Sequence, residues 1–420
     1  MKTNLTRRLL ALLLAMIVAV GAIPLTVIPA SAAVAADGLV YEIIDGEITI
    51  TGYNGSESKL YIPASIRGCP VTKIGYSAFS GCGVITEVTI PEGVTLIDAD
   101  AFYYCTNLKS ITLPDSLTYI GMSAFYSCEK LEGINIPSGV TTIGAGAFGG
   151  CISLASLTAD SDNTVYYAEG NCIITRADKS VVAGCALSEI PEGVISIGSS
   201  AFRYCRNLTN ITIPDSVKEI GSYAFGNCSN LVSIIFPEEL ESIGTYAFHN
   251  CISLADISIP KGVEEIESYA FYGCDSLENV TLPEGVKDIR EYAFYNCKKL
   301  KSISIPEDVI SISDYAFYYC EKLSTVYYGG TEEQWDKISI GSGNTYLTKA
   351  KRLYSGETED PAERMGISYE IADGKVTVTG YTGILTELVI PATIEGYPVT
   401  AIGDWAFELC RNLKSVQVKK

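Results

Sequence analysis

The chain has 420 residues, of which 47% are hydrophobic, and its formal net charge is −19 at pH 7 because 49 acidic residues oppose 30 basic ones. This acidic balance mainly confers solubility. It argues against nucleic acid and anionic lipid surfaces as partners, since both repel an acidic protein.

Residues 1–32 are predicted to be a secretory signal peptide. They combine a basic start with the apolar run Leu9 to Val20 and the small-residue sequence Ala30-Ser31-Ala32. A segment of this composition is removed on export and is not part of the fold. No later stretch approaches the ~20 apolar residues of a membrane-spanning helix. We therefore expect a protein without a membrane span that is extracellular or at the cell surface after cleavage.

Residues 37–61 are predicted to form an N-terminal hairpin cap. Two segments with alternating apolar residues, from Tyr41 to Tyr53, flank the turn sequence Asp45-Gly46. This pattern is typical of an antiparallel hairpin. A hairpin at this place would cover the first layer of the repeats that follow.

A 23-residue unit recurs through residues 62–328 and predicts a repeat solenoid. Its pattern is L-x-x-I-x-[IL]-P-x-x-[VL]-x-x-I-x-x-x-A-F-x-x-C-x-x, and prolines at 91, 114 and 137 keep the period. A fixed period of this length means that small supersecondary units stack and bury their cores against one another.

Each unit is expected to contain mostly short parallel strands and one helical turn. In the copy that begins at Leu108, residues 108–113 form a strand. Pro114 ends it, because proline has no N–H for the ladder. Residues 117–120 form a second extended segment on the opposite wall. Ala124-Phe125 then turn the chain back, and the Phe ring fills the centre of the layer.

The period breaks once, in an enlarged unit at residues 155–190. Within it, the segment from Cys172 to Ala177 and the segment from Ser180 to Cys185 mirror each other about Asp178-Lys179. A two-residue hairpin on that turn would place Cys172 directly opposite Cys185, which makes this pair a candidate disulfide. Two reduced thiols are the alternative.

Residues 329–354 are predicted to close the array. Thr331 and Gln334 have the spacing of a capping box, so a short helix that carries Trp335 is expected here.

Residues 355–366 are polar and are expected to form a linker. The sequence pattern of the N-terminal part then recurs, because Tyr369 to Cys410 matches Tyr41 to Cys82 at a constant offset of 328. Residues 367–420 are therefore predicted to start a second module of the same repeats.

The fourteen cysteines do not suggest a disulfide framework. Eleven of them occupy one column of the repeat, three residues after its Phe. Column neighbours in an in-register stack lie ~4.8 Å apart, but their Cβ vectors run parallel and do not converge. We expect a buried ladder of free thiols that act as small hydrophobes. The eleven are Cys82, Cys105, Cys128, Cys151, Cys205, Cys228, Cys251, Cys274, Cys297, Cys320 and Cys410.

The repeat resembles the BspA-like, or treponemal, class of leucine-rich repeats over about residues 60–330 and 390–415. The enlarged unit, the closing segment and the hairpin also resemble accessories found in secreted proteins of anaerobic Gram-positive bacteria. The resemblance implies a curved solenoid. It also implies an extracellular or cell-surface role in adhesion to host proteins, other cells or matrix.

Catalytic and metal-binding patterns are not found. The single histidine, His249, lies just after the Phe of its unit and is expected to be exposed. Hydrolytic triads, Cys–His dyads and histidine-based metal sites need histidine beside other fixed groups. The acids Asp160, Asp162 and Asp178 lack a regular calcium-ligand spacing. We expect no enzyme activity, no catalytic residue, no metal and no cofactor.

Tyrosines supply the candidate ligand surface. One row stands just before Ala-Phe in five successive units, and a second row stands just after the Phe. Stacked at the repeat rise, they would form a stripe ~20 Å long. Tyrosine suits recognition of a protein or glycan, but each ring could instead cover its own layer and pack on its neighbour. The rows are Tyr223, Tyr246, Tyr269, Tyr292 and Tyr315, and then Tyr272, Tyr295 and Tyr318.

A second candidate surface is the outward column of the first strand in each unit. Its residues are small and mostly polar: Thr89, Thr112, Asn135, Thr212, Ile235, Ser258, Thr281 and Ser304.

The sequence thus predicts a secreted, non-catalytic recognition or adhesion protein that presents the tyrosines and the concave face to an extracellular protein or glycan. The alternative is the targeting module of a larger extracellular enzyme whose catalytic domain lies beyond Lys420.

Overall fold

The computed structural model describes the array and, apart from short gaps, the second module. The described residues are 33–34, 38–355, 366–381, 387–394, 397–408, 410 and 413–418. The predicted signal peptide and residues 356–365 of the predicted linker lie outside them. Within the described residues, no helix has the length and apolar character needed to cross a membrane.

An antiparallel hairpin covers the first layer of the array. Strands β2 and β3 pair around Asp45-Gly46, and β3 then pairs in parallel with β6. Ile48 and Ile50 are fully buried against the first repeats. The predicted hairpin is therefore present, and it gives the array a paired first edge. The elements here are β1 (Ala33–Val34), β2 (Leu39–Ile44), β3 (Glu47–Tyr53) and β5 (Ser65–Ile66).

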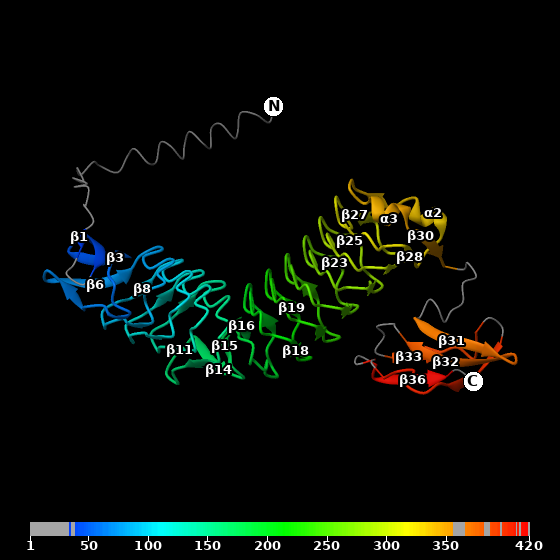
Figure 1. Ribbon diagram of the computed structural model, residues 1–420, viewed down its shortest axis with the longest axis horizontal. Coiled ribbons are helices and arrows are strands. Elements are labelled where there is room, and N and C mark those ends of the chain that lie inside the picture. The colour runs from blue at the N-terminus through cyan, green and yellow to red at the C-terminus, as the bar shows by residue number, and fades with distance from the viewer. Residues whose placement is uncertain are drawn as a thin grey trace, which may run out of the picture.

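Two walls of short parallel strands run along the array, whose successive turns follow an arc in Figure 1. Neighbouring strands pair in constant register, as Val88 with Ile111 and Ile97 with Ile120. Each column of the repeat therefore lies directly over the same column of the next unit. The first wall comprises β4 (Lys59–Tyr61), β7 (Glu87–Thr89), β9 (Ser110–Thr112), β11 (Gly133–Ile136), β13 (Ser156–Ala159), β18 (Asn210–Thr212), β20 (Ser233–Ile235), β22 (Asp256–Ser258), β24 (Asn279–Thr281), β26 (Ser302–Ile305), β28 (Thr325–Tyr328) and β30 (Lys351–Tyr354). The second wall comprises β6 (Cys69–Ile74), β8 (Leu96–Ile97), β10 (Tyr119–Ile120), β12 (Thr142–Ile143), β17 (Ser196–Ile197), β19 (Glu219–Ile220), β21 (Ser242–Ile243), β23 (Glu265–Ile266), β25 (Asp288–Ile289), β27 (Ser311–Ile312) and β29 (Ser339–Ile340).

A column of stacked phenylalanines forms the centre of the core. Consecutive ring centroids lie 4.9 to 5.6 Å apart, and the ring planes differ by 4° to 13°. Every ring is buried, so each layer contributes one large apolar side chain to a stack, and the enlarged unit divides the column into two such stacks. The column consists of Phe79, Phe102, Phe125 and Phe148, and then Phe202, Phe225, Phe248, Phe271, Phe294 and Phe317.

The chain reverses at Ala-Phe through successive tight turns and not through an α-helix. In one unit, the amides of Ala101, Tyr103 and Cys105 donate to carbonyls three residues earlier. The alternate amides of Phe102 and Tyr104 donate to the next layer, at 2.7 and 2.8 Å. This alternation requires left-handed residues, and Tyr104 has a φ of 57°.

The enlarged unit inserts a wall between two cores. Its strands β14 (Tyr166–Glu169), β15 (Cys172–Thr175) and β16 (Ser180–Ala183) pair in antiparallel order, and β16 pairs in parallel with β17. Because side chains alternate along a strand, Ile173 packs in the upstream core and Ile174 in the downstream core. Gly184 lies against Phe202, where a Cβ would come within 2.0 Å of the ring. The hairpin thus buries both of its faces.

The closing segment caps the far end of the array. Helix α2 (Glu332–Trp335) begins with the predicted capping box, in which the Gln334 amide donates to Thr331 Oγ1 and the Thr331 amide donates to Gln334 Oε1. Trp335 packs edge-on against Tyr328, with ring centroids 5.2 Å apart. A second helix, α3 (Thr345–Lys349), precedes β30.

The second module repeats the structure of the N-terminal cap. Strands β31 and β32 pair Ile367 with Tyr381, as β2 and β3 pair Leu39 with Tyr53. The offset of 328 therefore holds in the structure as well as in the sequence. Its strands are β31 (Ile367–Ala372), β32 (Lys375–Tyr381), β33 (Glu387–Ile390), β34 (Thr393–Ile394), β35 (Tyr397–Ile402) and β36 (Ser415–Val418).

Truncation of one ring should weaken the whole array. Phe248→Ala removes a fully buried ring that stacks on two neighbours, and we expect it to lower the free energy of unfolding by ~3–5 kcal/mol. Urea denaturation followed by circular dichroism measures this loss. Tyr76→Ala, at a side chain 67% exposed, is the control and should change stability by less than ~0.5 kcal/mol. Equal effects of the two substitutions would contradict a stacked core.

Candidate binding surface

The tyrosines singled out in the sequence form two rows of stacked rings, which we call the tyrosine flank. The first row is Tyr223, Tyr246, Tyr269, Tyr292 and Tyr315, with centroid distances of 4.5, 4.3, 4.6 and 5.3 Å. The second row is Tyr272, Tyr295 and Tyr318, with distances of 4.6 and 5.6 Å. All eight side chains are partly buried.

The first row occupies backbone positions that do not favour tyrosine. Its φ angles run from 57° to 61°, in the left-handed region. Other units place Ser77, Ser123, Gly146 or Ser200 there with similar φ angles. A bulky residue in this region costs about 1 kcal/mol or more, so the turn itself does not call for tyrosine. The gain that offsets this cost comes from the rings, through stacking or through contacts outside the chain.

Stacking decides which part of each ring faces outward. Planes within the first row differ by 5° to 13°, so each ring covers the face of its neighbour. The edges and hydroxyl groups are left for other contacts. Burial, together with neighbouring phenols, raises the pKa of Tyr246. The flank therefore presents hydroxyl groups and ring edges.

The closing segment covers the last ring of the first row. The Tyr315 amide donates to the Ser342 carbonyl at 2.7 Å. Gly343 lies so close to the Tyr315 ring that a Cβ would come within 2.3 Å of Cδ1. The stack is thus closed at this end, and its accessible surface is lateral.

The aromatic surface also continues across the enlarged unit, which was not predicted from the sequence. Tyr103 stacks on Tyr126 at 5.1 Å, Tyr126 meets Tyr204 edge-on at 5.2 Å, and the Arg203 guanidinium lies 4.5 Å from the Tyr223 ring centroid. Tyr103, Tyr126 and Arg203 share the column of the second row, as their position just after the Phe of each unit indicates. The structure adds that the turns stay continuous across the insertion, since the Gly150 amide donates to the Arg203 carbonyl.

A profile of the BspA type leucine rich repeat region matches this chain in six copies, at residues 58–173, 178–265 and 241–340. The chain belongs to the BspA-type leucine-rich repeat family.

Solved structures of leucine-rich repeat proteins are similar to this chain. A leucine-rich repeat protein from Eubacterium ventriosum is 22% identical, covers 78% of this chain and 96% of its own, and has a TM-score of 0.57. A leucine rich cell surface protein from Faecalibacterium prausnitzii is 26% identical over 73% of this chain and 97% of its own, with a TM-score of 0.45. A leucine-rich repeat protein from T. pallidum is 32% identical over 53% and 90%, with a TM-score of 0.36. A comparison with curated proteins found no match.

The single histidine of this BspA-type array is half-buried, and the expectation that it is exposed is wrong. The His249 ring stacks on Tyr272 at 5.0 Å and meets Tyr246 edge-on at 5.5 Å. Burial and the charge of Arg203 lower the pKa of His249 below its usual range. The imidazole is therefore neutral at neutral pH and belongs to the aromatic surface.

The cysteine column of the repeat donates hydrogen bonds between layers. In eight units the thiol donates to the Phe carbonyl of the preceding unit, at 3.0 to 3.3 Å. Burial raises the pKa of Cys251 and of Cys320 to about 12. These side chains are thus buried donors as well as small hydrophobes, and a nucleophilic thiolate is disfavoured. The eight are Cys105, Cys128, Cys151, Cys228, Cys251, Cys274, Cys297 and Cys320.

The register proposed for Cys172 and Cys185 is wrong. A bulge shifts the pairing of β15 and β16, so that Ile174 pairs with Val181 and Ile173 with Ala183. Cys172 consequently packs in the downstream core and Cys185 in the upstream core. Both are buried free thiols in the structure.

The outward column of the first wall is present as the sequence predicted. Thr112, Asn135 and Thr212 are exposed, and Ile235 is the one large apolar side chain among the column residues identified in the sequence. This column offers hydrogen-bonding groups but few anchors.

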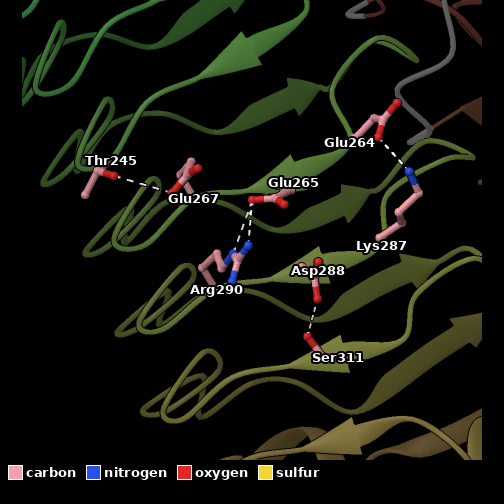
Figure 2. Close-up of polar contacts among 8 residues, drawn as sticks. All are labelled: Thr245, Glu264, Glu265, Glu267, Lys287, Asp288, Arg290 and Ser311. Carbon is pink, nitrogen blue, oxygen red and sulfur yellow. Dashed lines mark hydrogen bonds and ion pairs between the residues drawn. The ribbon is translucent and has the colours of Figure 1, made fainter. Parts of the chain in front are cut away.

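Some cations of the second wall are paired with carboxylates. Figure 2 shows Arg290 paired with Glu265 and Lys287 with Glu264, and both pairs join neighbouring units. These exposed pairs add little stability. No group of three or more histidine, cysteine or acidic side chains is placed to hold a metal in the described ranges.

The free state of the thiols can be measured directly. We expect alkylation in denaturant without reductant to label all fourteen cysteines, since the column thiols run parallel and Cys172 and Cys185 face different cores. Intact mass spectrometry counts the labels, and a sample reduced beforehand is the control. A mass lower by one pair of labels, mapped to Cys172 and Cys185, would restore the disulfide.

Proposed function

We propose that this chain is a secreted or cell-surface recognition protein that uses its tyrosine flank to bind a protein outside the cell. The observation that carries the proposal is the first row of tyrosines, held in left-handed backbone positions that serine, aspartate or glycine occupies in the units before Tyr223. A costly residue repeated in five successive units is best explained by contacts that the ring supplies.

The exposed chemistry of the flank favours a protein over a glycan. Sugars commonly bind aromatic side chains through an open ring face, and here the faces are covered by neighbouring rings. Ring edges and hydroxyl groups instead suit the mixed apolar and hydrogen-bonding contacts of protein interfaces, in which tyrosine is a frequent anchor.

The location outside the cell is supported by the predicted signal peptide. We also propose a non-catalytic role. Its support is the chemistry of the nucleophile candidates. Eight column thiols are buried donors, and burial raises the pKa of Cys251 and of Cys320 to about 12. The one imidazole is packed between tyrosine rings.

A binding screen with a matched pair of variants tests the proposal. The chain is exposed to immobilised extracellular matrix proteins and polysaccharides, and then compared with a triple variant that carries Tyr246→Ser, Tyr269→Ser and Tyr292→Ser. Serine is native at the equivalent position of three other units, so the backbone should tolerate it. We expect protein binding to weaken by at least about tenfold, as truncation of interface tyrosines commonly does.

The control variant carries Tyr61→Ser and Tyr76→Ser, which alter two highly exposed tyrosines away from the flank. It should bind as the parent does. Equal binding by the triple variant, with its fold intact by circular dichroism, would remove the flank from the function.

A further inference from the structure

Two arginines beside the tyrosine flank have no anionic partner. The ion pairs of the described residues use other cations, such as Lys218, Lys287 and Arg290, and neither Arg203 nor Arg206 takes part in any of them. The Nε of Arg203 is also buried without a hydrogen-bond partner. An unsatisfied buried donor is uncommon and calls for an explanation.

Aromatic rings hold both guanidinium groups in place. The Arg203 guanidinium lies 4.5 Å from the Tyr223 centroid and 5.5 Å from that of Tyr204, and the Arg206 guanidinium lies 5.4 Å from the Tyr204 centroid. Such cation–π contacts orient a guanidinium but do not neutralise its charge. The pair therefore keeps its capacity to bind an anion.

The repeat column of Arg203 has no side chain in the two adjacent layers. Its column holds Gly149 in the preceding layer and Gly226 in the following one, as the bonds from Gly150 to the Arg203 carbonyl and from Tyr204 to the Gly226 carbonyl establish. Neither glycine has a side chain to cover the guanidinium. Arg206 is exposed beside it.

The acidic chain offers many carboxylates, but neither arginine pairs with one. It has 49 acidic residues against 30 basic ones, and Lys218, Lys298 and Lys301 each pair with a carboxylate of a neighbouring unit. Two adjacent guanidinium groups without a carboxylate partner are suited to bind a carboxylate of another molecule. Guanidinium donors fit a carboxylate with two parallel hydrogen bonds.

We propose that Arg203 and Arg206 form a carboxylate-binding site for an acidic peptide segment of the protein partner. This inference rests on the proposed function and names the chemistry of the partner. A peptide carboxylate is favoured over an acidic sugar because the ring faces at the site are already covered, that of Tyr204 by both arginines and that of Tyr223 by Arg203 and Tyr246.

A labelled hexaglutamate peptide tests the site directly. Fluorescence anisotropy is measured with the full chain, and hexaglutamine and a galacturonan oligosaccharide of matched charge are run beside it. The acidic chain repels polyanions generally, so background binding should be small. We expect Arg203→Gln and Arg206→Gln each to weaken hexaglutamate binding by about tenfold, the usual effect of losing a charge-assisted hydrogen bond.

Arg290→Gln is the matched control, because it removes the same charge from an arginine that already has a carboxylate partner. It should leave hexaglutamate binding unchanged. Arg203→Lys keeps the charge but lacks the planar fork and should bind with intermediate affinity. If Arg203→Gln lowers the thermal unfolding midpoint, Arg206→Gln decides the test, because the Arg206 side chain is exposed.

Three results would overturn the site: no hexaglutamate binding, equal binding by the Arg206→Gln and Arg290→Gln variants, or tighter binding of the galacturonan than of the peptide. Binding of the protein partner identified in the matrix screen distinguishes the arginine site from the tyrosine flank. Loss of its binding with the tyrosine variants but not with Arg203→Gln would reject the arginine site and leave the flank standing.

Discussion

The spacing of 23 residues between hydrogen-bonded neighbours is the constraint on which the structure depends. It recurs in the strand ladders, in side-chain bonds such as Thr118 to the Thr95 carbonyl, and in ion pairs such as Lys287 with Glu264. Because every column stays over itself, one residue type repeated in the sequence becomes a continuous row in space. The phenylalanine stack, the thiol donors and the tyrosine flank are three results of this single rule.

The enlarged unit shows how the array absorbs extra residues without losing that register. Its hairpin sits between two cores, with alternate side chains of β15 in each. On the turn side, the layers before and after the insertion bond directly, from Gly150 to Arg203. The same junction brings Tyr126 edge-on against Tyr204, whose ring also contacts Arg203 and Arg206. The two arginines therefore stand among aromatic rings in the first layer after the insertion.

Much of the fold could be predicted from the sequence, because periodicity and turn chemistry are local signals. The hairpin at Asp45-Gly46 and the capping box at Thr331 were predicted from such signals, and both are present in the structure. The register of β15 and β16 was not, since a bulge changes the pairing without changing the mirror pattern of the residues. The candidate site was predicted as rows of tyrosines. Their left-handed backbone, their covered ring faces and the role of Arg203 depend on contacts between layers. The sequence of a single unit does not reveal these contacts.

Deletion of a whole unit tests the stacking rule most directly. Removal of residues 241–263 joins Leu240 to Glu264 and returns every later column to its place over the earlier ones. This shortened chain should fold cooperatively, with the circular dichroism of the parent. Removal of residues 241–262, one residue fewer, moves each strand by one position and turns its apolar side chains to the wrong face, so that it should not fold beyond the junction. Equal thermal unfolding midpoints for the two deletions would contradict the account.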